Sequence, residues 1–595
     1  MILLVVAFAT LAAACRRGAG VRDAVMSAAV IFGAIAVFTT ENLSLLGALR
    51  RDPVAIVWAL VIVGASTISW RRTARWGVSQ WPPWREVWPE ALSIGAVAVL
   101  SGLVGVTALI SAPNSADAMA YHLPRIVYWI QQASVSLFPT HYLNQVMLQP
   151  FAEYITLQTW LLSDGDRFAN LPQYCAYLLC ISGASLVAKE MGGIRRAQVI
   201  AAVACATLPN AVLQASGAKN DLVLAFTLSA FVYFGIRYGR RRGRDDLAYA
   251  SLAAALALFT KGTAYLFLPP LFVAIVTVAE RPPLVGRNLG LACAVATLLT
   301  NGPLYLRNVR LSGSPLGFDS AHADGKFRWR NEPPGFRATA SNLLRHTADQ
   351  LGARSPSWNR GLYDVVERAH VWIGADLNAP GTTWRWSKFE TPRNDNHEAS
   401  ANNRVHLMLY ALCCVAAMLS PAARKALWLP AALLAGMVLF AGYLKWQPFQ
   451  IRMLAPLYVL GAPLAGFVLA RGRTLAQFAF CALLLDGARL PATENWTRPL
   501  EGPRSIFRIE RSAGYFADLA PWGNEEAYRQ AADWILESGC SSVGLDLSEY
   551  QIEYPLIALL RARNPAVRFR HINVRNPSRA FDRDEARPVW FLVFF

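Results

Sequence analysis

Five side chains that can move protons or bind phosphate lie in one polar stretch of about forty residues. They are Asp117, His122, Arg125, His141 and Glu153. Carboxylate and imidazole groups are common general bases and acids, and a guanidinium binds phosphate through two parallel hydrogen bonds. Because apolar runs precede and follow this stretch, we expect it to form a site at a membrane surface.

Asp117 has two interpretations. A carboxylate a few residues beyond a membrane span can take a proton from an acceptor hydroxyl, or hold a cation against a phosphate. Alternatively, Asp117 is the N-cap of a helix that begins near Ala118, since Asp is a preferred capping residue. The residues alone leave both open. His122 and Arg125 follow at spacings of five and eight, so one side of a short helix can carry all three.

Other polar groups stand at the ends of later apolar runs. Glu153 begins an otherwise apolar helical turn, where a carboxylate needs a partner, and this favours a functional role. Further candidates for substrate binding are Lys219, Asp221, Arg307, Asn308, Trp446, Gln447 and Arg452. The alternatives are a tight polar turn for Lys219 and Asp221, and simple contact with lipid headgroups for Arg125.

The elements that carry these groups are membrane spans. The chain is 54% hydrophobic and 16% charged, whereas a typical soluble domain is about 25% charged. Apolar runs predict about fourteen spans. They are 1–14, 24–47, 53–70, 91–111, 170–189, 197–215, 220–237, 246–261, 263–279, 287–306, 404–420, 426–444, 452–470 and 474–490. The first of them also resembles a signal peptide or lipoprotein leader, but no basic region precedes it, which favours a short span. The predicted fold is therefore an α-helical polytopic membrane protein.

The net charge of +18 is explained by where the basic residues lie relative to the membrane. The arginines cluster in short loops between spans, and seven such loops fall on one face if the spans alternate, which makes that face cytoplasmic. The same placement argues against a nucleic-acid partner. Loops 112–169 and 307–403 and the tail from Pro491 are then predicted to lie outside. We expect an integral protein of the bacterial cytoplasmic membrane with its active site outside.

The chain is predicted to have three parts. Residues 1–90 form N-terminal spans, 91–490 a catalytic membrane region, and 491–595 a small extracytoplasmic α/β domain. In the last part we expect helices at 524–538 and 552–563 and strands at 542–547, 567–574 and 588–594. Eight of the nine cysteines lie in apolar runs, so the sequence supports neither a disulfide framework nor a zinc site.

Five segments carry a family resemblance. They are NSADAMAYHLPR, QPFAEY, GDRFANLPQ, PLYLRNVRLSGSPLG and QPFQIRMLAP. Together they resemble the C-type, membrane-embedded glycosyltransferases, which include protein O-mannosyltransferases and lipid A aminoarabinose transferases. The resemblance spans roughly residues 91–470, and it implies transfer of a sugar from a polyprenyl-phosphate donor to an envelope acceptor (glycan, lipid or protein).

The resemblance also implies roles for residues. Asp117 matches the catalytic or metal-associated carboxylate of the family, with Glu153 as a second acid or a sugar-hydroxyl ligand. Arg125, Lys219 and Arg452 would hold the phosphate, and a divalent metal ion at Asp117 is the only cofactor implied. Two features depart from the family pattern: Ala116 and Ala118 replace a paired-acid motif, and three apparent spans precede the span that leads into the first large loop.

Two other classes of function remain as alternatives. A transporter or flippase of a lipid-linked saccharide would place ionisable groups near the middle of the bilayer. Here they gather at the outer ends of spans, which favours an enzyme at the membrane surface. A non-catalytic scaffold that docks partners through its tail is the third possibility.

Overall fold

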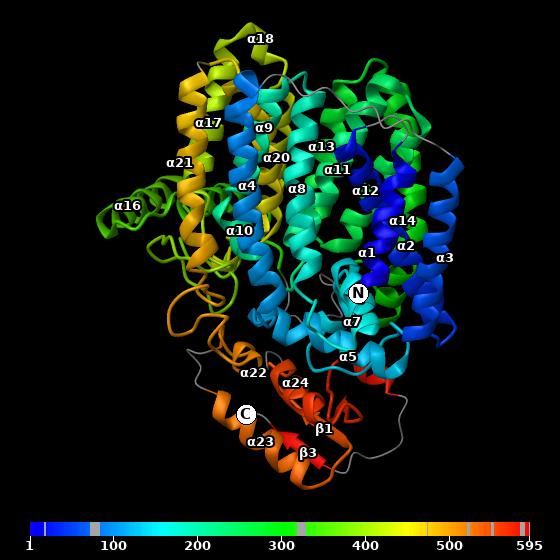
Figure 1. The fold of residues 1–595 in the computed structure, drawn as a ribbon. Coiled ribbons are helices and arrows are strands. Elements are labelled where there is room, and N and C mark those ends of the chain that lie inside the picture. Colours follow the sequence, from blue (N-terminus) through cyan, green and yellow to red (C-terminus); the bar gives the residue numbers. More distant parts are fainter. Residues whose placement is uncertain are drawn as a thin grey trace.

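The structure is a computed structural model that describes residues 1–16, 20–71, 84–317, 329–472, 474–519, 524–548, 552–582 and 590–593. An upright bundle of helices stands above a smaller body that contains a sheet (Figure 1). The bundle helices are α1 (Ile2–Cys15), α2 (Val21–Leu45), α3 (Arg51–Arg71), α4 (Trp84–Ile110), α8 (Leu171–Glu190), α9 (Arg195–Ala206), α11 (Asp221–Arg241), α12 (Arg244–Thr260), α13 (Ala264–Thr277), α14 (Pro282–Ser312), α17 (Arg404–Leu419), α19 (Trp428–Tyr443), α20 (Ala455–Leu469) and α21 (Thr474–Thr493).

Every predicted span coincides with one of these helices, apart from a break in the span 197–215. There the chain leaves α9 after Ala206 and resumes as α10 (Pro209–Gln214), because Pro209 has no N–H to continue the hydrogen-bond ladder. Seven of the described helices are long and apolar enough to cross a membrane by themselves. The polytopic helical fold is thus confirmed, while the count of fourteen spans stays a prediction.

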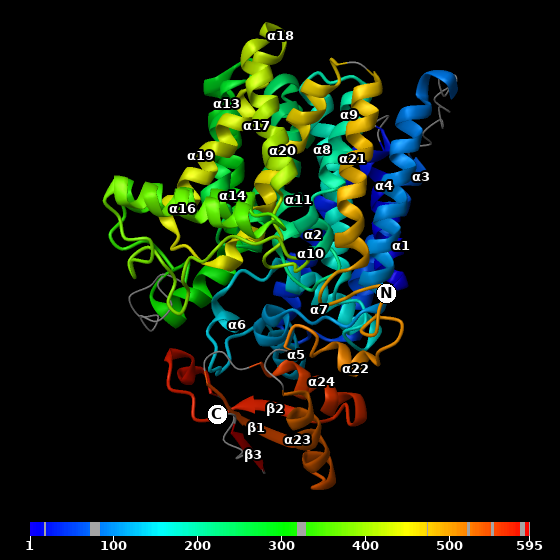
Figure 2. The same cartoon turned by 90° about the vertical axis from the view of Figure 1, so that its left-hand side faces the viewer.

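The stretch between α4 and α8 folds into short helices packed beneath the bundle (Figure 2). They are η1 (Ala118–His122), α5 (Leu123–Gln132), α6 (Asn144–Met147) and α7 (Phe151–Ser163). Their side chains are buried to an extent that is unusual for a surface loop; Met119, Ile126, Tyr154 and Leu157 are all inaccessible or nearly so. This stretch is therefore a packed layer that holds its polar groups in fixed positions.

The loop 307–403 contains α15 (Phe336–Leu351) and α16 (Pro356–Ile373), and α16 projects sideways from the bundle (Figures 1 and 2). Trp446, which lies just before η3 (Pro448–Leu454), packs against this loop. Its indole Nε1 donates to Asp349 Oδ2 at 2.8 Å, and the Arg345 guanidinium lies 5.2 Å from the centre of its ring. Trp446 is thus part of the packing of loop 307–403.

Asp349 predicts how stability depends on pH. Burial raises the pKa of its carboxyl to about 7, although Trp446 and Arg345 oppose the shift. A raised pKa means that the folded state favours the protonated acid. The contribution of Asp349 to the free energy of unfolding is therefore complete near pH 4 and is lost as the pH rises through 7. Asp349→Asn keeps an acceptor for Trp446, and we expect its melting temperature relative to wild type to rise between pH 5 and 8. The difference corresponds to at most about 4 kcal/mol.

Melting curves in detergent at both pH values test this expectation. The matched control is Asp376→Asn, since Asp376 is an exposed aspartate of the same loop. If the melting temperatures of both variants differed from wild type by the same amount at the two pH values, Asp349 would be ionised throughout this range.

The tail folds around a three-stranded parallel sheet of order β2-β1-β3, from β1 (Ser542–Asp546), β2 (Arg568–His571) and β3 (Trp590–Val593). In its register Ser542 pairs with Arg568 and Val543 with Trp590. Helix α24 (Tyr554–Arg563) supplies the crossover that parallel β1 and β2 require. The remaining elements are α22 (Arg511–Gly514), α23 (Glu525–Glu537) and η5 (Pro577–Phe581).

The tail is joined to the layer beneath the bundle by buried polar contacts. Tyr128 Oη of α5 donates to Glu553 Oε2 at 2.7 Å, and Glu553 also accepts from Gln145 Nε2 and lies 3.2 Å from His571 Nε2. Loop 307–403 reaches the tail as well, through His397 and Asp518. Loops 112–169 and 307–403 and the tail therefore meet at one end of the bundle.

We expect this end to be extracytoplasmic, because the arginine-rich turn between α11 and α12 lies at the other end of the bundle. In a background without native cysteines, Asp533→Cys in the tail should react with a membrane-impermeant maleimide added to intact cells. Arg242→Cys in the turn should react only after the membrane is opened. Labelling of both positions from the same side would contradict the topology.

Candidate functional site

Ionisable side chains from distant segments converge where the bundle meets the layer beneath it. Asp117 directly precedes η1, and Arg452 lies in η3, just before α20. Arg452 Nη2 donates to Asp117 Oδ2. The Arg452 side chain is 8% exposed and that of Asp117 30%, so the pair is shielded on the Arg452 side and open on the Asp117 side.

Asp117 does occupy the N-cap position of η1, but its side chain does not act as a cap. Within the described chain its side chain caps no backbone N–H. Ser115 takes that place, because its Oγ accepts from the backbone N–H of Ala118 at 3.2 Å. The carboxylate of Asp117 is consequently left for Arg452 and for any ligand.

A second and a third ion pair adjoin the first. Asp221, the first residue of α11, accepts from Lys261, which follows α12 directly. Lys219 Nζ lies 2.5 Å from Glu398 Oε1, and both side chains are almost inaccessible. Glu398 also accepts from Arg498, whose side chain is completely buried. One carboxylate thus serves two cations.

The basic groups of this cluster outnumber the acidic ones. We call it the central cluster; its members are Asp117, Lys219, Asp221, Lys261, Glu398, Arg452 and Arg498. Four are basic and three acidic. Buried charge without a partner is unfavourable, so the surplus cation favours an anionic ligand.

The carboxylates of the cluster are held in the ionised state. Burial would raise the pKa of Asp117, but Arg452, and then Lys219 and His122, outweigh it and hold the pKa well below its ordinary range. Glu398 behaves alike: Arg498 and Lys219 overcome the effect of burial and lower its pKa. Asp117 is therefore a negative charge at every physiological pH, and a weak base while Arg452 stays bound.

Glu153 is the centre of a neighbouring buried group. Its Oε1 lies 2.8 Å from His122 Nδ1 and accepts from Arg125 Nη1 at 2.9 Å. Burial acts against ionisation, but His122 and then Arg125 lower the pKa of Glu153. Arg125 also donates to the carbonyl of Leu148 at 2.8 Å. His122 connects this group to the central cluster, because it contributes to lowering the pKa of both Asp117 and Glu153.

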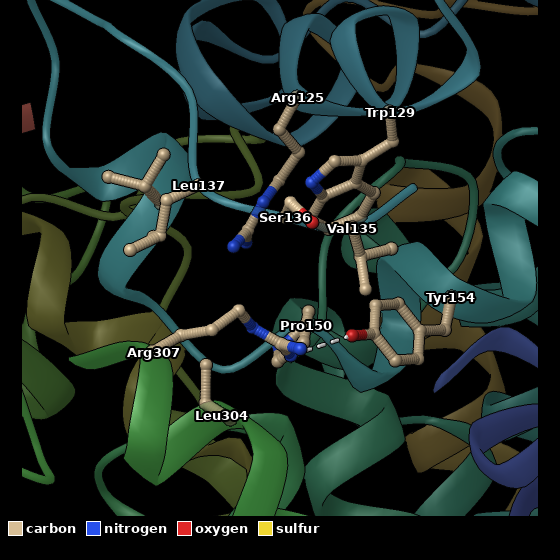
Figure 3. A pocket seen from close by; sticks show the side chains of 10 residues that line it. Arg125, Trp129, Val135, Ser136, Leu137, Pro150, Tyr154, Leu304 and Arg307 are labelled. Carbon is tan, nitrogen blue, oxygen red and sulfur yellow. Dashed lines mark hydrogen bonds between the residues drawn. The ribbon is translucent and has the colours of Figure 1, made fainter. Parts of the chain in front are cut away.

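Arg125 and Arg307 face one narrow pocket, and Figure 3 shows both side chains reaching into it, with the Arg307 guanidinium beside the hydroxyl of Tyr154. Trp129, Leu137, Tyr154 and Leu304 are among its walls. Arg307, from α14, binds both oxygens of Glu41 in α2, at 2.8 and 2.7 Å, and also donates to Tyr154 Oη at 3.1 Å. Each arginine of the pocket therefore already has a carboxylate partner.

The structure places the other sequence candidates elsewhere. His141 contacts the tail, where its Nε2 lies 2.8 Å from the carbonyl of Ile572. Asn308 donates to the carbonyls of Met147 and Pro315 at 3.2 and 3.1 Å. Gln447 forms a capping box with Gln450 at the start of η3. The contacts of these residues, like those of Trp446, are with the protein's own backbone and loops.

The surroundings of Asp117 do not suit a divalent metal ion. Arg452 and Lys219 are the charges that act most strongly on it, and both would repel a cation. Across the described ranges, three or more His, Cys, Asp or Glu side chains nowhere gather in a way that could hold a metal. We therefore derive no step that uses one.

Sequence reasoning missed several members of these groups, namely Glu41, Glu398 and Arg498, and it did not assign Lys261 to the site. Glu41 lies inside an apolar span, and an ionisable residue there is itself a signal for a functional partner. Glu398 and Arg498 lie in long polar segments, where nothing distinguishes them from solvated charges.

Part of the chain is similar in sequence to a known protein family. Residues 149–305 match the sequence profile of the dolichyl-phosphate-mannose-protein mannosyltransferase family. The matched region contains Glu153, Lys219, Asp221 and Lys261. The match covers about a quarter of the chain, and it agrees with the resemblance to the C-type membrane glycosyltransferases.

Two solved structures are similar over most of their length. One is ArnT from Cupriavidus metallidurans bound to undecaprenyl phosphate, with 16% identity and a TM-score of 0.47, covering 81% of this chain and 90% of that one. The other is the same protein in the apo state, with 16% identity, a TM-score of 0.46, and coverage of 82% and 87%. None of the curated proteins matches the chain.

Proposed function

We propose that the protein transfers a sugar from a polyprenyl-phosphate donor to an acceptor of the cell envelope, on the outer face of the cytoplasmic membrane. The observation that carries this proposal is the central cluster, in which a partly open carboxylate is surrounded by a surplus of buried cations. The match of residues 149–305 to a family named for dolichyl-phosphate-mannose supports it.

The reaction requires one bond to form and one to break. A hydroxyl oxygen of the acceptor attacks the anomeric carbon of the sugar, the bond from that carbon to the phosphate oxygen breaks, and the lipid phosphate leaves with the electron pair. The acceptor proton passes to a carboxylate, for which Asp117 is the candidate. The negative charge that develops on the phosphate is stabilised by fixed cations, which is usually a large contribution to catalysis.

The leaving phosphate is assigned to Lys219 and Arg452 rather than to the pocket of Arg125 and Arg307. Arg307 is fully engaged by both oxygens of Glu41. Lys219, in contrast, shares Glu398 with Arg498, so its charge is only partly neutralised. Arg452 pairs with Asp117, whose side chain is 30% exposed, so this cation borders the open side of the central cluster.

This arrangement links donor binding to the activation of Asp117. While Arg452 holds Asp117, the pKa of the carboxyl is lowered and the group is a poor base. A phosphate that binds Arg452 competes for its charge, and the pKa of Asp117 then rises toward the range where it accepts a proton. Asp117 therefore becomes a better base when the donor is present.

Glu153 is proposed to act as a ligand of sugar hydroxyls and as the support of His122. Its oxygen Oε2 is buried without a hydrogen-bond partner in the described structure, whereas Oε1 holds His122 and Arg125. A carboxylate with one oxygen engaged and one unused can accept a hydrogen bond from a hydroxyl of the substrate.

The test is at Lys219. Lys219→Met removes one cation and leaves Glu398 paired with Arg498, so we expect the fold to persist. Loss of a charged hydrogen bond to phosphate, worth roughly 1.5–3 kcal/mol, predicts that undecaprenyl phosphate binds roughly 10- to 100-fold more weakly. Binding is measured by native mass spectrometry of the protein in nanodiscs.

The control is Lys189→Met, an exposed lysine in the last turn of α8 at the far end of the bundle. Transfer is measured in parallel, with a panel of undecaprenyl-phosphate hexoses and pentoses and a bacterial envelope extract as acceptor. Unchanged affinity in Lys219→Met, together with no release of lipid phosphate by the wild type, would refute the proposal.

A further inference from the structure

We infer that Asp518, in the tail, is a positioning residue for Asp117. One oxygen of its carboxylate, Oδ2, accepts the backbone N–H of Ala116 at 2.8 Å. The other, Oδ1, lies 2.8 Å from His397 Nε2. This inference rests on the proposed function, since it assigns the tail a role in the same reaction.

Each contact lies one residue from a member of the central cluster. Ala116 precedes Asp117, and His397 precedes Glu398, the carboxylate that holds Lys219 and Arg498. A single side chain thus connects the turn that carries the candidate base with the loop that carries the partner of the phosphate-binding lysine. The connection sets the distance between them, which neither loop could do alone.

The amide of Ala116 needs such a partner. It lies just before η1, and the first N–H groups of a helix have no acceptor within the helix. Ser115 satisfies the N–H of Ala118 and, through its carbonyl, that of Met119. Asp518 supplies the acceptor for Ala116, and an ionised acceptor makes roughly twice as strong a hydrogen bond as a neutral one.

Asp518 can act in this way because its own segment is held firmly. Arg511 donates to Asp166 Oδ1 at 3.0 Å, and Tyr515 Oη donates to Asp166 Oδ2 at 2.8 Å. Tyr554 of α24 donates to that same oxygen, also at 2.8 Å. Asp166 belongs to the loop between α7 and α8, so the segment before Asp518 is fixed to the stretch that also contains Asp117.

The consequence for the reaction is specific. Asp518 touches neither Asp117 nor a basic residue of the central cluster directly, so its loss should leave the phosphate-binding groups in place. It should allow the Asp117 turn to move, and small displacements of a reacting group are costly to turnover. We therefore expect a fall in kcat of roughly 10- to 100-fold with little change in the KM for the donor.

Two variants and a control test the inference. Asp518→Ala removes both contacts. Asp518→Asn retains an acceptor for the Ala116 amide but loses the contact with His397, because His397 Nδ1 accepts from Ala399 and its Nε2 is therefore the donor. We expect this variant to restore part of the turnover. The control is Asp533→Ala, which removes a surface pair with Arg563 inside the tail and should behave as the wild type.

Hydrogen–deuterium exchange supplies a readout that does not depend on activity. In the full-length protein in nanodiscs, peptides covering residues 113–123 should exchange faster in Asp518→Ala than in wild type, Asp518→Asn or the control. Protection unchanged in Asp518→Ala would overturn the inference, even if transfer were observed. Faster exchange with an unchanged kcat would show that the contact is structural only, and would also overturn it. A third outcome is that the wild type transfers no sugar while exchange responds as expected. The proposed function then fails, and with it the role of Asp518 in the reaction. The contact between Asp518 and the Asp117 turn would still stand.

Discussion

Replacing Asp117 with asparagine should reduce sugar transfer by a factor on the order of 10²–10⁴, the usual contribution of a general base. Asn keeps the size of the side chain and can still accept a hydrogen bond from Arg452, but it cannot take the acceptor proton. The measurement is release of undecaprenyl phosphate from its sugar conjugates in nanodiscs. Full activity of the variant would remove Asp117 from the mechanism, and Glu153→Gln would be examined next.

Stability should respond as well, because the ion pair with Arg452 is lost. Removing one partner of a buried pair costs about 3–5 kcal/mol, and the partial exposure of Asp117 reduces this to roughly 1–3 kcal/mol. The matched control is Asp164→Asn, an aspartate of the same layer whose pair with Arg51 is well exposed. That variant should lose neither turnover nor stability, so a parallel fall in both variants would indicate a general effect on the layer.

The largest loss of stability is expected from Arg498→Leu. The Arg498 side chain is completely buried and donates to Glu398, to Asn114 Oδ1 at 2.5 Å, to Ser216 Oγ at 3.1 Å and to the carbonyl of Leu213 at 3.3 Å. Truncating one partner of such a pair leaves buried polar groups unsatisfied, which costs about 3–5 kcal/mol. The variant should melt well below wild type in nanodiscs.

A second substitution separates charge from packing. Glu398→Gln combined with Arg498→Leu removes the carboxylate that would otherwise lose one of its two cations, so the double variant should lose less stability than the sum of the two single ones. Additive losses would show that Arg498 stabilises the fold through its other hydrogen bonds. The control is Arg563→Leu, whose pair with Asp533 is half exposed.

The helices of the bundle were predictable because the membrane limits what a span can be. An apolar run must be long enough to cross the bilayer and must satisfy its own backbone hydrogen bonds, so the runs near 171–190, 221–241 and 282–312 are evident from composition. Basic loops then orient them. The break at Pro209 was also visible in principle, since proline cannot continue a helix.

The gathering of Asp117, Lys219, Asp221 and Arg452 at one end followed from that topology, but their partners did not. Arg452 lies 335 residues from Asp117, and Glu398 lies in a polar loop with no pattern to set it apart. Arg498 and Asp518 belong to the tail, which was predicted as a domain separate from the catalytic membrane region. No local property of these residues encodes which charge each one meets.

By itself, then, the sequence predicted a polytopic membrane protein, its helices and the end of the bundle at which the ionisable groups gather, because periodicity, length and charge are local properties of the chain. Only the tertiary structure decided that Ser115 and not Asp117 caps η1, that Glu398 serves both Lys219 and Arg498, and that Asp518 reaches the turn beside Asp117. These pairings depend on how loops hundreds of residues apart pack against one another, and the energy of a buried charge is set by that packing alone.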